Sequence, residues 1–126
     1  MSKSPIGRPF DEIVQTRALR EPAYADGLLQ EAVQAMLAGD LDVARSLIRD
    51  VIKGSIGYAE LSKRTGTPEK SLVRMFGPKG NPTVANLFGV LAQLQRHSGV
   101  TIQVEVVPSR KQRLAKPRSV PNRRAA

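Results

Sequence analysis

The chain has 126 residues, the usual length of one small domain, and its core must be aliphatic because aromatic residues make up only 4% of it. It contains no cysteine, which excludes disulfides, thiolate zinc sites and a cysteine nucleophile, and no apolar run approaches the roughly 20 residues that a membrane span needs. The net charge is +9, but residues 1–107 carry 13 of the 20 basic side chains and all 11 acidic ones, so most of the positive charge lies in residues 108–126.

The N-terminal third predicts two helices after a short lead. Residues 1–9 contain two prolines and a glycine, and we expect them to be flexible. A first helix is predicted over residues 10–20 and ends before Pro22, since the residue that precedes a proline avoids the helical conformation. Pro22 suits the first turn of a second helix, which Gly39 can end in a left-handed conformation. These N-terminal helices occupy residues 10–38.

The middle of the chain predicts three further helices. One covers residues 41–53, with Asp40 as its N-cap and an apolar stripe at helical spacing. Two short helices cover residues 58–65 and 68–76. The turn between them needs a positive backbone angle, which Gly66 supplies.

A loop and a last helix follow. Residues 77–82 (Gly-Pro-Lys-Gly-Asn-Pro) are strong loop residues, and Thr83 can cap a helix that runs to about Arg96. Together with the preceding helices this makes a core unit over residues 41–97. The apolar side chains of the last helix that we expect to face inward are Val84, Leu87, Phe88, Leu91 and Leu94.

The C-terminal part predicts one strand and a tail. Residues 101–107 alternate apolar Ile102, Val104 and Val106 with mostly polar neighbours, which is typical of a β-strand. A lone strand needs a partner, either an early segment of the chain or the same strand of a second subunit. Residues 108–126 are rich in proline and cations, and we expect a disordered basic tail that serves solubility, contacts phosphate or wraps a partner.

Residues 58–76 predict a helix-turn-helix, the motif that places a recognition helix in the major groove of DNA. The small side chain of Ser62 allows close approach of the two helices. Thr67-Pro68 resembles an N-cap followed by a proline at the first helical position. The residues expected to close the core between the helices are Leu61, Leu72 and Met75. The alternative is a plain helical hairpin with solvated charges.

The start of the second helix carries the expected base contacts. Lys70 and Arg74 can donate hydrogen bonds to guanine, Glu69 can accept one from cytosine, and Ser71 can pair with several bases. Phosphate contacts are expected from nearby cations and from amides at helix starts. The residues in this second group are Lys63, Arg64, Thr67, Lys79, Asn81 and Thr83.

No pattern of catalytic residues is visible. His97 is the only histidine and stands near a helix end, without clustered ligands or base partners. Residues 77–83 lack the Gly-Lys-Ser/Thr ending of a nucleotide-binding loop. We therefore expect no enzyme activity, no cofactor and no metal.

Several short runs resemble a known family, most specifically the Gly-Asn-Pro-Thr run before the last helix. Residues 41–97 resemble the lambda-repressor/Cro-like helix-turn-helix domain, and residues 10–107 resemble the addiction-module antidote family, the HigA-like antitoxins. The runs that carry the resemblance are Phe10-Asp11, Tyr24, Leu28-Leu29-Gln30-Glu31-Ala32, Gly39-Asp40, Ala59-Glu60-Leu61-Ser62, Gly66, Ser71-Leu72, Gly80-Asn81-Pro82-Thr83, Leu87 and Val90-Leu91.

The resemblance implies a homodimeric antitoxin of a type II toxin–antitoxin module. Such a protein neutralises a RelE/HigB-like ribonuclease toxin and represses its own operon by binding a palindromic operator in the bacterial cytoplasm, on the nucleoid. It also implies base readout by Glu69, Lys70, Ser71 and Arg74. The chain departs from the family at Tyr58, where a polar residue usually contacts phosphate and where the tyrosine hydroxyl would replace it.

The predicted fold is therefore all-α, a lambda-repressor-like domain of five to six helices with one short C-terminal strand. Two alternatives to the antitoxin stay open: a stand-alone helix-turn-helix regulator without a toxin, and a protein-interaction adaptor. A RelE-like toxin is itself basic, so its expected contact is the acidic part of the chain, residues 10–50.

Overall fold

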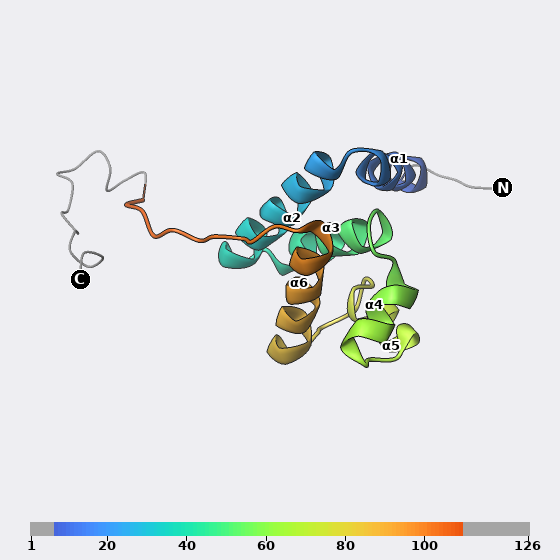
Figure 1. Ribbon diagram of the computed structural model, residues 1–126. Helices are drawn as coiled ribbons and strands as arrows, with labels where there is room; N and C mark the ends of the chain where they lie inside the picture. The colour runs from blue at the N-terminus through green and yellow to red at the C-terminus, as the bar shows by residue number, and fades with distance from the viewer. Residues whose placement is uncertain (1–6, 110–126) are drawn as a thin grey trace.

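The computed structural model describes residues 7–109, which form six α-helices and no strand (Figure 1). Most of the expected lead and tail, residues 1–6 and 110–126, lies outside the described residues. The all-α prediction is confirmed for the described part of the chain. The helices are α1 (Gly7–Arg20), α2 (Pro22–Leu37), α3 (Leu41–Lys53), α4 (Tyr58–Thr65), α5 (Glu69–Met75) and α6 (Val84–Ser98).

The helix boundaries follow the capping residues that the sequence shows. Gly39, Gly66 and Gly99 have φ angles of +84°, +79° and +70° just after three of the helices, a conformation that glycine adopts without strain. At the start of α6, the Thr83 hydroxyl accepts a hydrogen bond of 3.1 Å from the backbone N–H of Asn86. Local chemistry therefore determines where these helices end and where α6 begins.

Two helix starts differ from the prediction. Helix α1 begins at Gly7 rather than at Phe10, so the end of the expected lead is helical. Helix α5 begins at Glu69 with Pro68 as its N-cap residue, one position later than expected. Thr67 therefore does not cap α5, and its N–H instead donates to the hydroxyl of Thr65.

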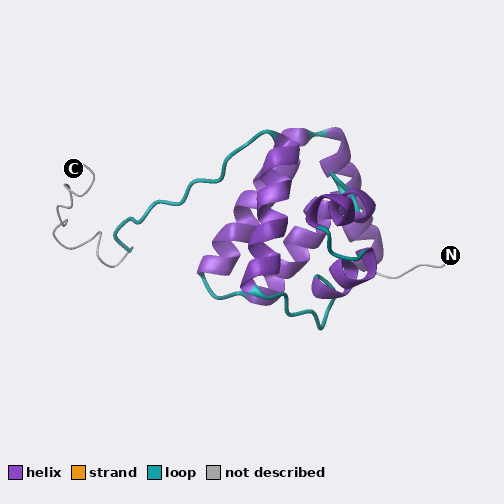
Figure 2. Cartoon of the chain, turned by 60° about the horizontal axis from the view of Figure 1, so that its bottom comes forward, coloured by secondary structure: helices purple, strands orange, loops and turns teal. Residues whose placement is uncertain are grey.

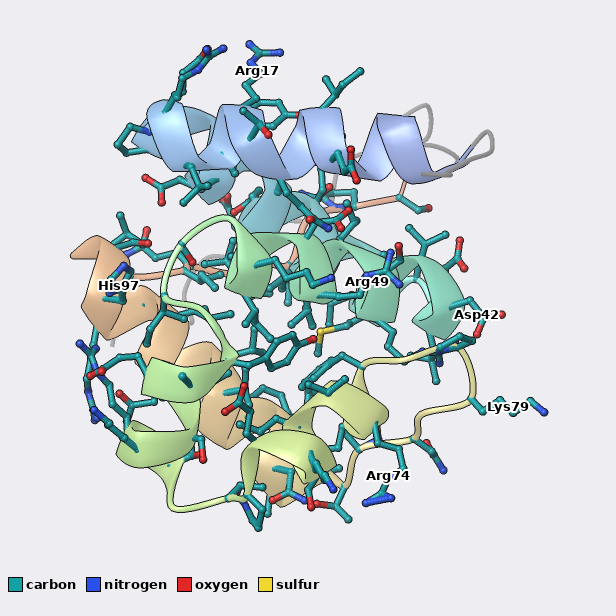
Figure 3. The ribbon with its side chains drawn as sticks, turned by 90° about the vertical axis from the view of Figure 1, so that its right-hand side faces the viewer. Arg17, Asp42, Arg49, Arg74, Lys79 and His97 are labelled. Carbon is teal, nitrogen blue, oxygen red and sulfur yellow. The ribbon has the colours of Figure 1, made fainter. Side chains whose placement is uncertain are left out.

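Helix α3 is the centre of the fold. It packs against α1, α2 and α4, while α4 also packs against α5 and α6. Figure 3 shows α1 on one side of α3 and the α4–α5 pair on the other. The helices gather side by side (Figure 2), and their buried apolar side chains form one core. The largest fully buried side chains in that core are Leu29, Ile48, Ile52, Leu61, Leu72, Phe76, Val90 and Leu94.

Helix α1 docks on α3 through a close backbone approach. A Cβ atom added to Gly54 would lie 2.5 Å from the Cβ of Ala18, so only glycine fits there without a shift. Beside this contact, the Gln15 amide donates a 2.9 Å hydrogen bond to the carboxylate of Asp50, which is 6% exposed. A buried carboxylate needs such partners, because burial without them is unfavourable. The α1–α3 contact is therefore specified by both shape and hydrogen bonding.

The predicted strand over residues 101–107 is wrong for the single chain. The Ile102 N–H donates to the Gln95 side-chain oxygen at 2.7 Å, and the segment then leaves the helices in an extended conformation without a strand partner (Figures 1 and 2). A strand forms only when its backbone pairs with another. None of the other described segments forms a strand that could pair with it.

The predicted inward face of α6 is wrong at two positions. Val90, Leu91 and Leu94 are buried, but Val84 is 71% and Phe88 55% exposed. Helical spacing places apolar residues on a common stripe and does not determine how wide a stripe the neighbouring helices cover.

None of the helices within residues 7–109 is both long and apolar enough to span a membrane.

Candidate nucleic-acid interface

The turn between α4 and α5 is built from short-range hydrogen bonds. Gly66 adopts the left-handed conformation, and its N–H donates to the carbonyl of Ser62 at 2.9 Å. The Ser62 hydroxyl in turn donates to the carbonyl of Thr67 at 2.6 Å, and the Thr65 hydroxyl donates to the carbonyl of Leu61 at 2.9 Å. Ser62 therefore locks the turn as well as being small, a role that the sequence did not reveal.

The inner face of the α4–α5 pair is apolar, as predicted. Leu61 and Leu72 are 0% and 1% exposed, and Met75 packs against the same core. Phe76, which directly follows α5, is 1% exposed and is the largest of the fully buried side chains. This core fixes which side of α5 is left to solvent.

The outer side of α5 carries the predicted base-reading residues. Glu69, Lys70 and Arg74 are exposed, while Ser71 is half-buried. Within residues 7–109, the side chains of Lys70 and Arg74 make no hydrogen bond or ion pair, so their donors are available to an added ligand. Figure 3 shows Arg74 pointing away from the helices. Three of the four predicted side chains are thus exposed on α5.

Further cations surround α5. Lys63 is exposed in the last turn of α4, and Lys79 is exposed in the loop after α5. In Figure 3, Arg74 projects from the bottom of the view and Lys79 from its right-hand side, and His97 lies at the left. Arg64 already has a partner in the structure, because its guanidinium forms an ion pair with Glu60 at 3.1 Å. This exposed pair is weak, so a phosphate can compete for Arg64 at small cost.

The loop that carries Lys79 is held to α3 by Arg45. The Arg45 guanidinium donates to the carbonyls of Pro78 at 3.0 Å and Gly80 at 3.2 Å, and it pairs with Asp42 at 2.9 Å. Its side chain is only 17% exposed. The sequence does not predict this contact, because an arginine 35 positions before its partner has no local pattern that indicates it.

Gly80 makes the same loop tight. A Cβ atom at this position would lie 1.9 Å from the carbonyl oxygen of Met75, so no other residue fits without moving the backbone. Its N–H closes a turn onto the carbonyl of Gly77 at 3.0 Å. Asn81 and Thr83 follow as exposed residues that lead into α6. Arg45 and Gly80 together fix where Lys79 and the start of α6 stand relative to α5.

Tyr58 differs in character from the other predicted phosphate contacts. It is the first residue of α4, is half-buried, and packs against the core. Burial raises the pKa of its hydroxyl to about 12, an effect that the charge of Arg49 partly offsets and that of Asp50 reinforces. The hydroxyl therefore stays protonated at neutral pH and can donate a hydrogen bond.

The arrangement has the chemistry of a polyanion-binding surface. Exposed amine and guanidinium groups on α4, on α5 and in the following loop can donate to phosphates and to base edges. In the described part of the chain, no group of three or more histidine, aspartate or glutamate side chains could hold a metal ion. No protein-family model, curated protein or solved structure matches the chain.

Proposed function

We propose that this protein binds duplex DNA sequence-specifically through α4 and α5, with α5 as the recognition helix in the major groove. The observation that carries the proposal is the tight Gly66 turn, which buries Leu61 and Leu72 and leaves Lys70 and Arg74 exposed. A recognition helix contacts base edges with its N-terminal half, so it needs hydrogen-bonding side chains of this kind on its outer face.

The phosphate contacts come from the flanks of α5. Lys63 and Arg64 precede it, Lys79 follows it, and Thr83 stands at the start of α6, where free backbone N–H groups favour an anion. Such contacts fix the orientation of a protein on the duplex without reading sequence.

The biological role that we propose is that of an antitoxin which represses its own operon and neutralises a basic ribonuclease toxin. The acidic side chains support a toxin contact on residues 10–50, which hold 8 of the 11 in the chain. On this surface Ile13 and Leu19 are 64% and 63% exposed on α1. Copurification with the product of the neighbouring gene tests this role, and its absence favours a stand-alone regulator.

The experiment that tests DNA binding is a gel shift on the upstream promoter at a stated salt concentration. Arg74→Ala is expected to weaken binding to the operator by ~1–3 kcal/mol and to relax specificity at one base position. The matched control is Arg20→Ala, which removes the same charge from the exposed end of α1. Equal operator affinity for wild type and Arg74→Ala would overturn the assignment of Arg74 to a base.

One observation favours the alternative of a protein-binding adaptor. An apolar groove of about 230 Å³ lies between the end of α2, the start of α3 and the start of α6. Leu41, which lines the groove at the start of α3, is 58% exposed. Its apolar lining includes Met36, Leu41, Ala44, Ile48, Phe76 and Leu87. Two results together would favour the adaptor. The protein would not shift promoter DNA, and the Leu41→Lys variant would lose a protein partner that copurifies with wild type.

A further inference from the structure

The segment after α6 is held to that helix by hydrogen bonds at Val100 and Ile102, and the described residues directly after Ile102 make no such contact. The Val100 N–H donates to the Gln95 carbonyl at 3.0 Å, the Ile102 N–H donates to the Gln95 side chain at 2.7 Å, and Ile102 packs against the core. Beyond this point Val104 is 62% and Val106 97% exposed. Figures 1 and 2 show the segment running away from the helices.

The backbone of this segment is ready to pair. Among the described residues, no hydrogen bond involves the backbone groups of residues 103–107. The segment is extended, and its exposed side chains alternate between apolar and polar. An exposed extended segment of this kind is a template for pairing with another strand.

The segment is complementary to itself in one antiparallel register. If two copies pair with Val104 opposite Val104, Ile102 lies opposite Val106 at both ends. Gln103 then lies opposite Glu105, so the only charged side chain in residues 101–107 meets a neutral amide and not its own copy. Because side chains alternate between faces, all three apolar positions share one face of the paired ribbon. Directly opposed apolar pairs stabilise such a ribbon, and opposed like charges destabilise it.

Helix α6 carries an apolar surface on the same face as the residue that anchors the segment. Val84 and Phe88 are 71% and 55% exposed. Phe88 and Gln95 follow Val84 by 4 and 11 residues, spacings that return to the same side of a helix, so the three residues share one face of α6. Gln95 is the residue that holds Ile102. An isolated two-stranded ribbon is only marginally stable in water, and an adjoining apolar helix face is what it needs.

We propose that residues 101–107 of two copies of this chain pair as an antiparallel ribbon centred on Val104, with the apolar stripes of both α6 helices beside it. The contact is isologous, since each copy uses the same surface. This dimer goes beyond the proposed function and does not rest on it, because the contact between the paired segments (the dimer seam) forms without DNA.

A cysteine scan tests the register. The chain has no native cysteine, so any disulfide in a single-cysteine variant must join two copies at the introduced site. Directly opposed residues have Cβ atoms about 4.5–5.5 Å apart, close to what a disulfide requires, whereas diagonal neighbours are about 7–8 Å apart. Mild oxidation of full-length Val104→Cys without DNA is expected to give a covalent dimer. Glu105→Cys is the matched control and is expected to cross-link far more slowly; equal rates overturn the register.

The mass in solution tests the seam itself. Wild type is expected to be a dimer by light scattering, and Val104→Lys a monomer, because it places two ammonium groups opposite each other. Val107→Lys adds the same charge on the other face and should remain dimeric. Unchanged helical circular dichroism shows that the variants are folded. A monomeric wild type, or a dimeric Val104→Lys, overturns the proposal. A dimer that fails to shift DNA contradicts only the proposed function.

Discussion

Arg74 in α5 and Lys79 in the loop after it are both exposed cations, and the proposed interface gives them different roles (Figure 3). Arg74 stands on the outer face of α5, where a guanidinium can form two hydrogen bonds to guanine. Lys79 stands in a loop fixed by Arg45, at a place suited to phosphate. Charge alone does not distinguish the two residues; the element that carries each one does.

Lys79→Ala is therefore expected to weaken binding to operator and random DNA by the same factor. Removing one phosphate contact reduces the slope of log affinity against log salt by about 1, because fewer counterions are released on binding. Fluorescence anisotropy titrations at several salt concentrations measure this slope. Arg20→Ala serves as the control, and a Lys79→Ala slope equal to that of wild type contradicts the contact.

Tyr58 makes a prediction about stability at high pH. In the unfolded chain its hydroxyl ionises near pH 10.0, whereas burial raises its pKa in the fold to about 12. Between these values the folded state binds more protons than the unfolded state, so the contribution of Tyr58 is complete below pH 10 and is lost as pH rises toward 12. Tyr58→Phe should show a shallower fall in the free energy of unfolding across this window. Denaturant titrations measure it, and parallel falls for both proteins would contradict the assignment.

At the scale of elements, the loop between α5 and α6 depends on one glycine. Gly80→Ala places a Cβ atom against the backbone oxygen of Met75, where no side-chain movement can relieve the contact. Overpacking of this kind typically costs about 1–3 kcal/mol. We therefore expect Gly80→Ala to unfold at lower denaturant concentration and to weaken DNA binding by displacing Lys79.

Gly89 provides the matched control for Gly80. It lies inside α6, and an added Cβ atom there meets nothing within 4 Å. Alanine in a helix interior is favoured over glycine by about 0.5–1 kcal/mol, so Gly89→Ala should be stabilising. Equal denaturation midpoints for the two variants would show that the contact at Gly80 is easily relieved.

At the scale of the whole molecule, the proposed dimer sets a geometric requirement on the operator. Two recognition helices related by a two-fold axis reach half-sites separated by about one DNA turn, ~10 base pairs centre to centre, or by a multiple of it. Inserting half a turn, ~5 base pairs, between the half-sites should abolish cooperative binding, and inserting a full turn should restore part of it. Footprinting of both operator variants measures the occupancy of the two half-sites. Identical occupancy at every spacing would mean that the two copies bind independently.

The sequence by itself determined the helices, because their signals are local. The left-handed glycines, Pro22 and the Thr83 cap act within one or two turns, and the prediction of five to six helices is confirmed within residues 7–109, where six are present. The buried Leu61 and Leu72 and the exposed Lys70 and Arg74 also follow from local spacing, since a short helix packed on one side leaves the other to solvent.

Only the tertiary structure decided how distant residues meet. Three features depend on elements far apart in the chain: the close contact of Gly54 with Ala18 of α1, the contact of Arg45 with the loop before α6, and the exposure of Val84 and Phe88. Residues 101–107 show the difference most clearly. Their alternation is a local property that predicts a strand, but a strand requires hydrogen bonds to a second backbone, and the single chain does not supply one.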